Sequence, residues 1–371
     1  MTDERPQTSR RDRDTLRAQL TSWLATRVDD PVIGDLSIPA TNGMSSETLL
    51  FDITYRDANG APVDERCVAR LPPDDDATPV FPRYDMEMQF EAMRLVGART
   101  SAPVPACLWL ETDRAHLGTP FFVMRRVDGT VPPDLMPYTF GGNWLFDASP
   151  AEQRRVQDAS VVALAEVHRI AADDPALRFM DRPSDGRSAL RAHVDGWRDY
   201  HHWVIADGLG SPVCAEAFAH LEATWPEETE ARLSWGDSRI GNILYADFDP
   251  VAVLDWEMAG IAPREVDLGW MVFLHRFFQD LAVSYGMPGL PEFMRVDDVC
   301  DVYERASGYR PISLHWFMEY AAARHAAIMF RIARRSAAFG ETPMPDDPDL
   351  TIPHAGPLRE MIAGTYWDRL P

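Results

Sequence analysis

Short apolar runs broken by turn residues fill the first third of the chain, and longer helical patterns fill the remainder. Residues 33–40, 49–55 and 66–71 are each short, apolar and bounded by Gly, Pro or polar residues, which is typical of β-strands. The same criteria predict strands over 103–110 and 119–127. The first third is therefore predicted to be mainly β-structure.

Two helices are predicted among these strands. Apolar residues recur at helical spacing within residues 1–30, which predicts one amphipathic helix packed on the outside of the first domain. The residues on its apolar side are Leu16, Leu20, Trp23 and Leu24. Residues 84–98 show the same spacing and predict a second helix.

From residue 151 onward the pattern is helical. Helices are predicted over 151–171, 188–208, 212–224, 264–280, 296–307, 313–339 and 357–367. A polar turn and two short apolar runs interrupt this series at 233–257, and the two runs predict a hairpin of buried strands. We therefore expect a first domain over 1–127, a hinge and connection over 128–150, and a helical second domain over 151–371.

Composition narrows the classes of protein to consider. The net charge of −22 argues against a nucleic-acid binder or a protein held at an anionic membrane. No apolar run approaches about 20 residues and the first residues are polar, so we expect neither a spanning helix nor a signal peptide. The four cysteines form no C-x-x-C pair, which makes the reducing cytoplasm the simplest location.

All 36 basic residues are arginine, and the chain contains no lysine. Schiff-base chemistry and Ser-Lys nucleophiles are therefore excluded. A phosphate-binding loop of the form G-x-x-x-x-G-K-[ST] is excluded for the same reason. No lysine side chain is therefore available to offset the charge of a phosphate group.

The candidate catalytic and metal-binding residues lie in the segment 233–257, which interrupts the helices. Asp237 and Asn242 lie on the polar turn with D-x-x-x-x-N spacing, and Asp255 follows the second strand of the hairpin. Protein kinases use this spacing for a carboxylate that orients a hydroxyl and for an amide that holds magnesium. Asp237 is thus the candidate base, and Asn242 and Asp255 are the candidate metal ligands. The alternative is an ordinary Asp/Asn/Gly turn, with Asp255 capping the next segment of the chain.

Other enzyme classes fit the same residues less well. The segment from Gly236 to Gly241 has one residue too many for the G-x-S-x-G turn of serine hydrolases. No H-E-x-x-H motif indicates a zinc hydrolase. His168 is expected to be a packed structural histidine, and Asp267 is expected to brace the neighbouring segment.

The run from Gly236 through Asn242, the hairpin and the sequence Asp255-Trp256-Glu257 together resemble the aminoglycoside phosphotransferase-like family of small-molecule kinases. The branch that includes kinase domains attached to acyl-CoA dehydrogenases is the most similar. This resemblance implies an α+β, two-lobed, protein-kinase-like fold, with an antiparallel sheet and a helix in the first lobe and a mostly helical second lobe. It also implies ATP and Mg²⁺ as cofactors and transfer of a phosphoryl group to a small-molecule hydroxyl.

The resemblance also assigns nucleotide-binding residues. A Gly/Ser turn would cover the phosphates, Arg70 stands where kinases place a lysine, and Gln89 stands where the partner glutamate is expected. The end of the strand over 119–127 would contact adenine through its backbone. The residues implied are Gly43, Ser45, Ser46, Arg70, Gln89, Met124, Arg126 and Val127.

Three positions depart from the family pattern: Trp235 replaces a histidine, and Arg70 and Gln89 replace the lysine–glutamate pair. These departures leave a second hypothesis open, a nucleotide-binding regulatory protein with little catalysis. We interpret Trp235 as a brace that acts by packing and through its one N–H donor. The acceptor also stays open between an aminoglycoside, another polyol and a hydroxyacyl thioester.

Overall fold

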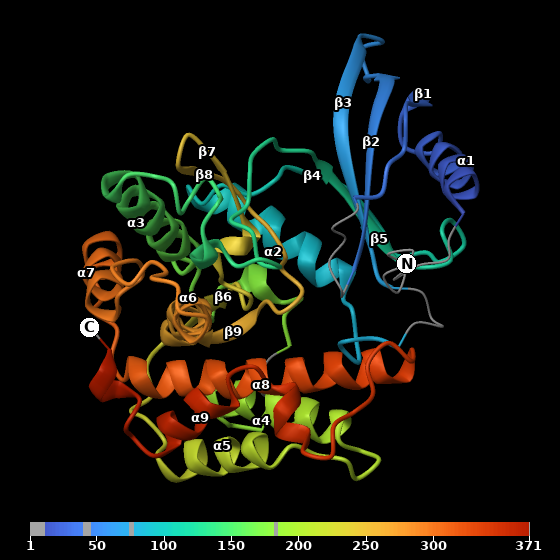
Figure 1. Cartoon of the computed structure of the whole chain (residues 1–371). Coiled ribbons are helices and arrows are strands. Elements are labelled where there is room, and N and C mark those ends of the chain that lie inside the picture. The colour runs from blue at the N-terminus through green and yellow to red at the C-terminus, as the bar shows by residue number, and fades with distance from the viewer. Residues whose placement is uncertain (1–11, 40–45, 74–77, 182–184, 371) are drawn as a thin grey trace. The chain divides into compact units, whose positions relative to one another are not determined.

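The computed structural model describes residues 12–39, 46–73, 78–181 and 185–370 (Figure 1). The chain forms two compact units. The first comprises Met1–Arg94 and Pro105–Val127, and the second comprises Leu95–Val104 and Asp128–Pro371. Gly43 and Ser45, two of the predicted phosphate-binding residues, lie outside the described residues.

A five-stranded antiparallel sheet forms the centre of the first unit, with the strand order β1-β2-β3-β5-β4 (Figure 1). Its strands are β1 (Asp29–Ile33), β2 (Glu47–Arg56), β3 (Pro62–Leu71), β4 (Cys107–Glu111) and β5 (Phe121–Arg125). Two helices, α1 (Arg13–Leu24) and α2 (Met86–Arg99), accompany these strands in the sequence. The predicted antiparallel sheet lobe with a helix is thereby confirmed.

Helix α1 packs on this sheet with the face that the sequence predicts. Asp12 caps its first turn by accepting a hydrogen bond from the Thr15 amide at 2.9 Å. Its four apolar residues are all buried and share one hydrophobic core with residues of β1, β2, β3 and β5. The Trp23 indole also donates to the buried Glu111 carboxylate at 2.8 Å, which ties the helix to β4.

The first strand differs from its prediction. The sequence predicts a strand over residues 33–40, but β1 ends at Ile33 and only an isolated bridge from Ser37 to Leu50 follows. Pro31 lies within β1, and a proline normally argues against a strand. It is tolerated here because β1 is an edge strand, paired only with β2 and interrupted by a bulge between Asp29 and Val32.

The second unit is built mainly from helices, as predicted. They are α3 (Pro150–Val167), α4 (Ala189–Val204), α5 (Pro212–Ala223), α6 (Arg264–Ser284), α7 (Val296–Ser307), α8 (Leu314–Ala338) and α9 (Ala355–Ile362). Their starts follow local sequence: Ser149 and Glu152 form a capping box at α3, and Ser188 and Ser211 cap α4 and α5. None of the helices in the described ranges is long and apolar enough to cross a membrane.

Two small sheets interrupt the helices and carry the predicted polar turn. Strands β6 (Ala231–Ser234) and β9 (Gly260–Pro263) pair with each other, and so do β7 (Ile243–Ala246) and β8 (Asp249–Val253). Asp247 and Phe248 connect β7 to β8 with positive φ angles of 49° and 68°, the handedness that matches the twist of a tight hairpin. The predicted hairpin is therefore confirmed, but its strands are only partly buried, at Ile243, Tyr245, Ala252 and Val253.

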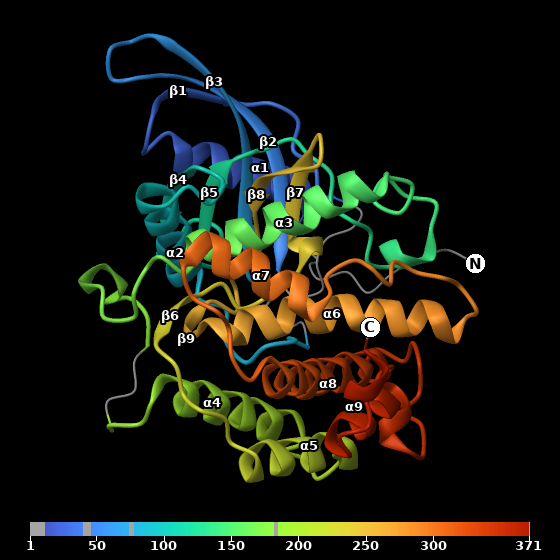
Figure 2. The same cartoon turned by 90° about the vertical axis from the view of Figure 1, so that its left-hand side faces the viewer.

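Helix α8 lies between α6 on one side and α4 and α5 on the other (Figure 2). The approach of α6 to α8 requires a glycine. A Cβ atom added at Gly269 would come within 2.6 Å of the Phe317 main chain, well inside van der Waals contact. This close approach brings side chains from the middle of α8 toward the start of α6.

Buried histidines make the stability of this unit depend on pH. His275 and His354 are buried, and burial lowers their pKa to about 3 and about 4 respectively. An unfolded histidine titrates near pH 6.5, so the unfolded chain binds protons that the folded chain refuses. The stabilisation is complete above about pH 6.5 and is lost as the pH falls toward the folded pKa, by at most about 1.4 kcal/mol per pH unit for each residue.

We therefore expect the free energy of urea unfolding to fall between pH 6.5 and 4.5, and the slope to flatten in His354→Phe. The neighbouring rings of Phe273 and Phe277 lie with centroids 5.3 Å from His354 and can accept a third phenyl ring. His202→Phe, at an exposed position, is the matched control and should keep the parental slope. An unchanged slope in His354→Phe would show that His354 is protonated equally in both states.

Candidate active site

The turn from Gly236 to Asn242 connects β6 to β7 and contains a short 3-10 helix over Ile240–Asn242. Gly236 has a φ of +92°, and a Cβ atom added there would lie 2.0 Å from the Met258 carbonyl oxygen. Only glycine fits that position without moving the neighbouring main chain. The conformation that presents Asp237 is thus specified by the residue immediately before it.

Three donors converge on the Asp237 carboxylate. The Trp270 indole N–H donates to Oδ1 at 2.7 Å, and the Asn242 amide donates to Oδ2 at 2.7 Å. The Arg239 Nε also donates to Oδ2, at 3.2 Å. A carboxylate accepts about four hydrogen bonds, so one acceptor position remains, on Oδ1. The carboxylate is therefore held in place and can still accept a proton from a hydroxyl.

Arg239 links this carboxylate to a second one. Its Nη1 forms an ion pair with Asp134, a residue of the segment before α3. Burial alone would lower the pKa of Arg239, but the carboxylates of Asp237 and Asp134 raise it well above its usual range. The arginine thus remains a cation and helps to keep the Asp237 carboxylate in one orientation.

Asn242 and Asp255 come together through main-chain contacts. The amide of Leu254, the residue before Asp255, donates to the Asn242 carbonyl at 2.9 Å. Asp255 itself has a positive φ of 59°, a conformation that residues other than glycine, asparagine and aspartate seldom adopt. Strained backbone of this kind concentrates at functional sites.

These two residues have the chemistry of a magnesium site. The Asn242 Nδ2 is engaged by the main chain and carboxylate of Asp237, so the amide oxygen is the atom that it can offer to a ligand. An amide oxygen and a carboxylate suit Mg²⁺, which takes few protein ligands and completes its shell with water and phosphate oxygens. Within the described ranges, no group of three His, Cys, Asp or Glu side chains is arranged to hold a metal alone. The donors therefore fit a metal that arrives with a nucleotide.

Asp267 holds the turn from beneath. It is fully buried at the start of α6, and its Oδ1 accepts from the Ser234 hydroxyl and the Gly236 amide, each at 2.9 Å. Its Oδ2 accepts from the Trp235 amide at 2.8 Å and from His168 Nε2 at 2.9 Å. Asp267 and His168 are thus parts of a buried hydrogen-bond network that braces the turn, as the sequence leads one to expect.

Trp235 occupies the position where the family pattern has a histidine. Its side chain is buried, and its indole N–H donates to the Leu254 carbonyl at 2.8 Å. Its ring lies 6.2 Å from that of Trp256, centroid to centroid. A tryptophan therefore joins the turn to the segment that carries Asp255, by the packing and the single donor that we predicted for it.

The predicted nucleotide-binding residues of the first unit lie on or beside its sheet. Arg70, on β3, donates from Nη1 to the Thr48 hydroxyl on β2 at 2.8 Å. Ser46 is buried just before β2. Gln89 is buried on α2, and its Nε2 has no hydrogen-bond partner among the described residues. The pairing of Arg70 with Gln89 stays a prediction.

The predicted adenine-binding segment follows β5. Met124 is buried in this strand and pairs with Val68 of β3 and Cys107 of β4. Arg126 continues the ladder, because its amide donates to the Arg66 carbonyl at 2.7 Å. Val127, the next residue, is the last of the first unit. The assignment of adenine contacts to these residues stays a prediction.

Sequence reasoning missed Arg239, Trp270 and Asp134. Arg239 had a local signal, since it is a charged residue inside the D-x-x-x-x-N motif. Trp270 had a weaker one, three residues after Asp267 on a predicted helix. Asp134 had none, because its pairing with Arg239 joins segments that are far apart in the sequence.

The chain is similar to known sequences over much of its length. The sequence pattern of the phosphotransferase enzyme family (APH) matches residues 51–295. Acyl-CoA dehydrogenase family member 10 of Mus musculus is 24% identical over 298 residues, which cover 77% of this chain and 25% of that protein. Family member 11 of Homo sapiens is 24% identical over 258 residues, covering 67% and 30%. The chain thus spans about a quarter to a third of the length of these curated relatives.

Solved structures show the same fold. A candidate aminoglycoside phosphotransferase from Ralstonia eutropha is similar with a TM-score of 0.65 and 19% identity, over 95% of this chain and 98% of that one. A thermostable mutant of aminoglycoside phosphotransferase APH(4)-Ia, in a ternary complex with AMP-PNP and hygromycin B, gives a TM-score of 0.55 and 17% identity over 94% and 100%. These similarities confirm the predicted fold class.

Proposed function

The chain belongs to the phosphotransferase enzyme family, and we propose that it transfers the γ-phosphoryl group of ATP to a hydroxyl of a small molecule. The observation that carries this proposal is the Asp237 carboxylate, held by three donors with one acceptor position left, in direct contact with Asn242. Family membership supports the reaction class. The nucleotide analogue bound by APH(4)-Ia supports ATP as the donor.

The residues of the candidate site would have separate roles in this reaction. Asp237 would accept a hydrogen bond from the acceptor hydroxyl at its remaining position, orient the oxygen and receive its proton. Asn242 and Asp255 would hold Mg²⁺, which offsets the negative charge of the phosphates. Arg239 and Trp270 keep the carboxylate in one orientation. Positioning of this kind and electrostatic stabilisation account for most of the catalysis in phosphoryl transfer.

A panel of hydroxyl compounds tests the proposal and identifies the acceptor class. The panel should contain aminoglycosides, neutral polyols and hydroxyacyl-CoA thioesters, the last because the curated relatives are named as acyl-CoA dehydrogenases. We expect release of ADP that depends on both magnesium and one acceptor class. If Mg-ATP binds but no compound stimulates ADP release, the regulatory hypothesis is favoured and the proposed function is wrong.

Arg70 is proposed to contact the α- and β-phosphates of the nucleotide. An arginine suits this role because its planar fork can bind two phosphate oxygens and stays charged. Such a contact is worth roughly 1.5–3 kcal/mol, so Arg70→Ala should raise the KM for ATP or lower kcat/KM by about ten- to a hundredfold. Arg70→Lys should recover part of this loss, because it restores the charge without the fork.

Arg66→Ala is the matched control, since Arg66 is an exposed arginine on the same strand. It should keep the parental KM for ATP. Should Arg70→Ala use ATP like the parent protein, Arg70 is a structural partner of Thr48 and another cation offsets the phosphate charge.

A further inference from the structure

Arg324 is a charged side chain with no exposed surface, in the middle of α8. No carboxylate lies within ion-pair distance of it in the described part of the chain. Its Nη2 donates to the Gly236 carbonyl at 3.3 Å, while its Nε and Nη1 have no hydrogen-bond partner among the described residues. A buried charge without a counter-ion is expensive, so its retention here requires a particular explanation.

Aromatic rings surround this guanidinium. Its Cζ lies 4.4 Å from the ring centroid of Trp270, 4.6 Å from that of Trp197 and 5.5 Å from that of Tyr320. The faces of aromatic rings attract cations, most strongly in the absence of water. The three rings come from α6, α4 and α8, so the charge is held at the point where these helices meet.

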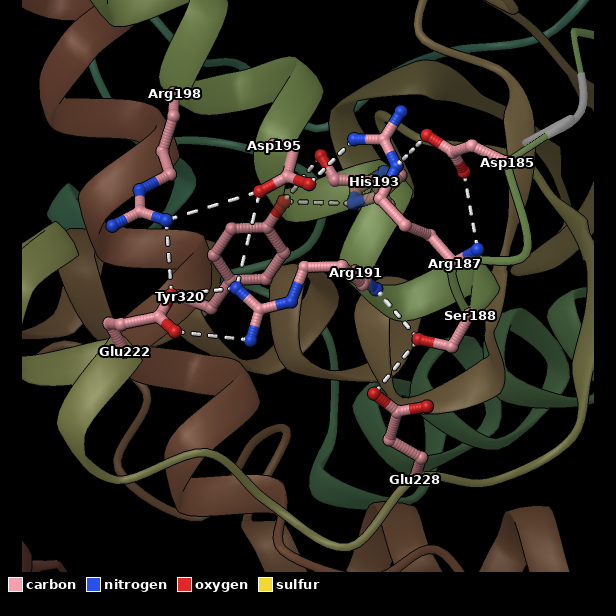
Figure 3. Close-up of polar contacts among 10 residues, drawn as sticks. All are labelled: Asp185, Arg187, Ser188, Arg191, His193, Asp195, Arg198, Glu222, Glu228 and Tyr320. Atoms are coloured by element: carbon pink, nitrogen blue, oxygen red, sulfur yellow. Dashed lines mark hydrogen bonds and ion pairs between the residues drawn. The ribbon is translucent and has the colours of Figure 1, made fainter.

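Tyr320, one of the three rings around Arg324, is itself held by hydrogen bonds. Tyr320 reaches from α8 to α4, where its hydroxyl lies 2.8 Å from His193 Nδ1 (Figure 3). Around this contact, Arg191 and Arg198 of α4 both bond to Glu222 of α5 (Figure 3). These contacts tie α8 to α4, and α4 to α5, close to Arg324.

On its other side, Arg324 touches two groups that hold the base. It donates to the carbonyl of Gly236, the residue immediately before Asp237. It also lies over the face of Trp270, whose N–H edge donates to Asp237 Oδ1 at 2.7 Å. A cation on the face of an indole draws electron density from the ring, which makes the N–H a stronger donor, and hydrogen bonds in chains reinforce one another.

We propose that Arg324 is a positioning residue for phosphoryl transfer, which holds Asp237 through the indole of Trp270 and the carbonyl of Gly236. This inference rests on the proposed function, because it gives Asp237 the role of base. It gives a role to a fully buried arginine that has no counter-ion among the described residues: its charge acts on the two groups that support the turn before Asp237. Arg324 itself contacts neither substrate nor nucleotide in this proposal.

A double-mutant cycle separates this role from simple packing. The variants are Arg324→Met, which removes the charge and keeps the length, Trp270→Phe, which removes the N–H and keeps a ring, and their combination. Arg331→Met is the matched control, because Arg331 lies on the same helix with its Cζ 4.4 Å from the ring of Trp203. These four variants and Arg324→Lys are compared in kcat and in the KM and Kd for Mg-ATP, at a temperature where each is folded.

Arg324→Met and Trp270→Phe should each reduce kcat about ten- to a hundredfold, with the Kd for Mg-ATP within about twofold of the parent, because charge-assisted hydrogen bonds are worth roughly 1.5–3 kcal/mol. The double variant should lose no more than the worse single variant, since both act on one carboxylate. Arg324→Lys should recover part of kcat, and Arg331→Met should match the parent. Losses that multiply in the double variant, or an Arg324→Met variant as active as the control, would overturn the proposal.

A second measurement does not need an acceptor. Hydrogen–deuterium exchange of the peptide spanning 234–242 should be faster in Arg324→Met than in either Arg331→Met or the parent. If the parent phosphorylates no acceptor, the proposed function fails, and this exchange still decides whether Arg324 holds the turn. Equal exchange in Arg324→Met and the parent would overturn the inference, whatever the panel shows.

Discussion

Asp237→Asn is expected to lower turnover by about a hundred- to ten-thousandfold, the usual contribution of a general base, with little change in nucleotide affinity. The substitution keeps the shape of the side chain but removes the basic oxygen that would receive the proton. The substitution should also break hydrogen bonds around the side chain. All three groups around the carboxylate are donors, so the new NH₂ group must face Trp270 or the pair formed by Arg239 and Asn242.

The measurement is acceptor-dependent ADP release together with the Kd for Mg-ATP. Asp249→Asn is the matched control: Asp249 lies in the hairpin beyond the same turn and forms an exposed ion pair with Arg155. It should keep the parental turnover, because exposed pairs contribute little. Normal turnover by Asp237→Asn on the true acceptor would show that Asp237 is not the base.

Asp255 should behave differently from Asp237 although we propose both for the same site. As a proposed metal ligand, it acts on the nucleotide complex as well as on the chemical step. Asp255→Ala should therefore abolish turnover and also weaken binding of Mg-ATP, while binding of free ATP changes less. A variant that binds magnesium and ATP together like the parent would remove Asp255 from the metal site.

The sequence predicted those parts of the site that are close together along the chain. Asp237 and Asn242 are five residues apart on one turn, and the hairpin that follows returns the chain to Asn242 at Leu254, the residue before Asp255. Their proximity follows from local geometry, so a spacing rule was enough. Arg239 lies within the same motif, and its charge beside the base could have identified it.

Apart from the bracing role expected for Asp267, the supports of the turn could not be predicted in this way. Asp267, Trp270 and Arg324 reach it from α6 and α8, through helix packing that depends on the contact between Gly269 and Phe317. No periodic pattern in a sequence shows which helices meet. A buried arginine such as Arg324 is also hard to recognise in a sequence, because a charged residue in a helix normally lies on the solvent-exposed face. The predicted range of the first strand was wrong for a related reason. Only the sheet order shows that β1 is an edge strand, where a proline such as Pro31 is tolerated.

Asp267→Asn should be the most destabilising single substitution in this network. Each oxygen of Asp267 accepts two hydrogen bonds from buried donors: Ser234 and Gly236 at Oδ1, and Trp235 and His168 at Oδ2. Burial alone would raise the pKa of Asp267, but hydrogen bonds and the charge of His168 lower it, so the group is a carboxylate.

An asparagine has only one oxygen, and its NH₂ group would face two donors that then lose their acceptor. Each buried donor left unpaired costs about 1–3 kcal/mol, which gives roughly 2–6 kcal/mol of lost stability. The free energy of urea unfolding should fall by this amount. The turn should also lose its fixed position, so that the folded fraction of Asp267→Asn has a reduced kcat.

Asp349→Asn separates these two effects. Asp349 is also buried and accepts hydrogen bonds from the Ser211 hydroxyl, the Val213 amide and Arg359, but it holds α5 and α9 rather than the turn from Gly236 to Asn242. Its asparagine variant should lose stability and keep the kcat of the parent in the molecules that remain folded. If Asp267→Asn instead lost stability alone, with parental kcat, the turn would hold its shape without Asp267, and Gly236 and Trp235 would suffice to present the base.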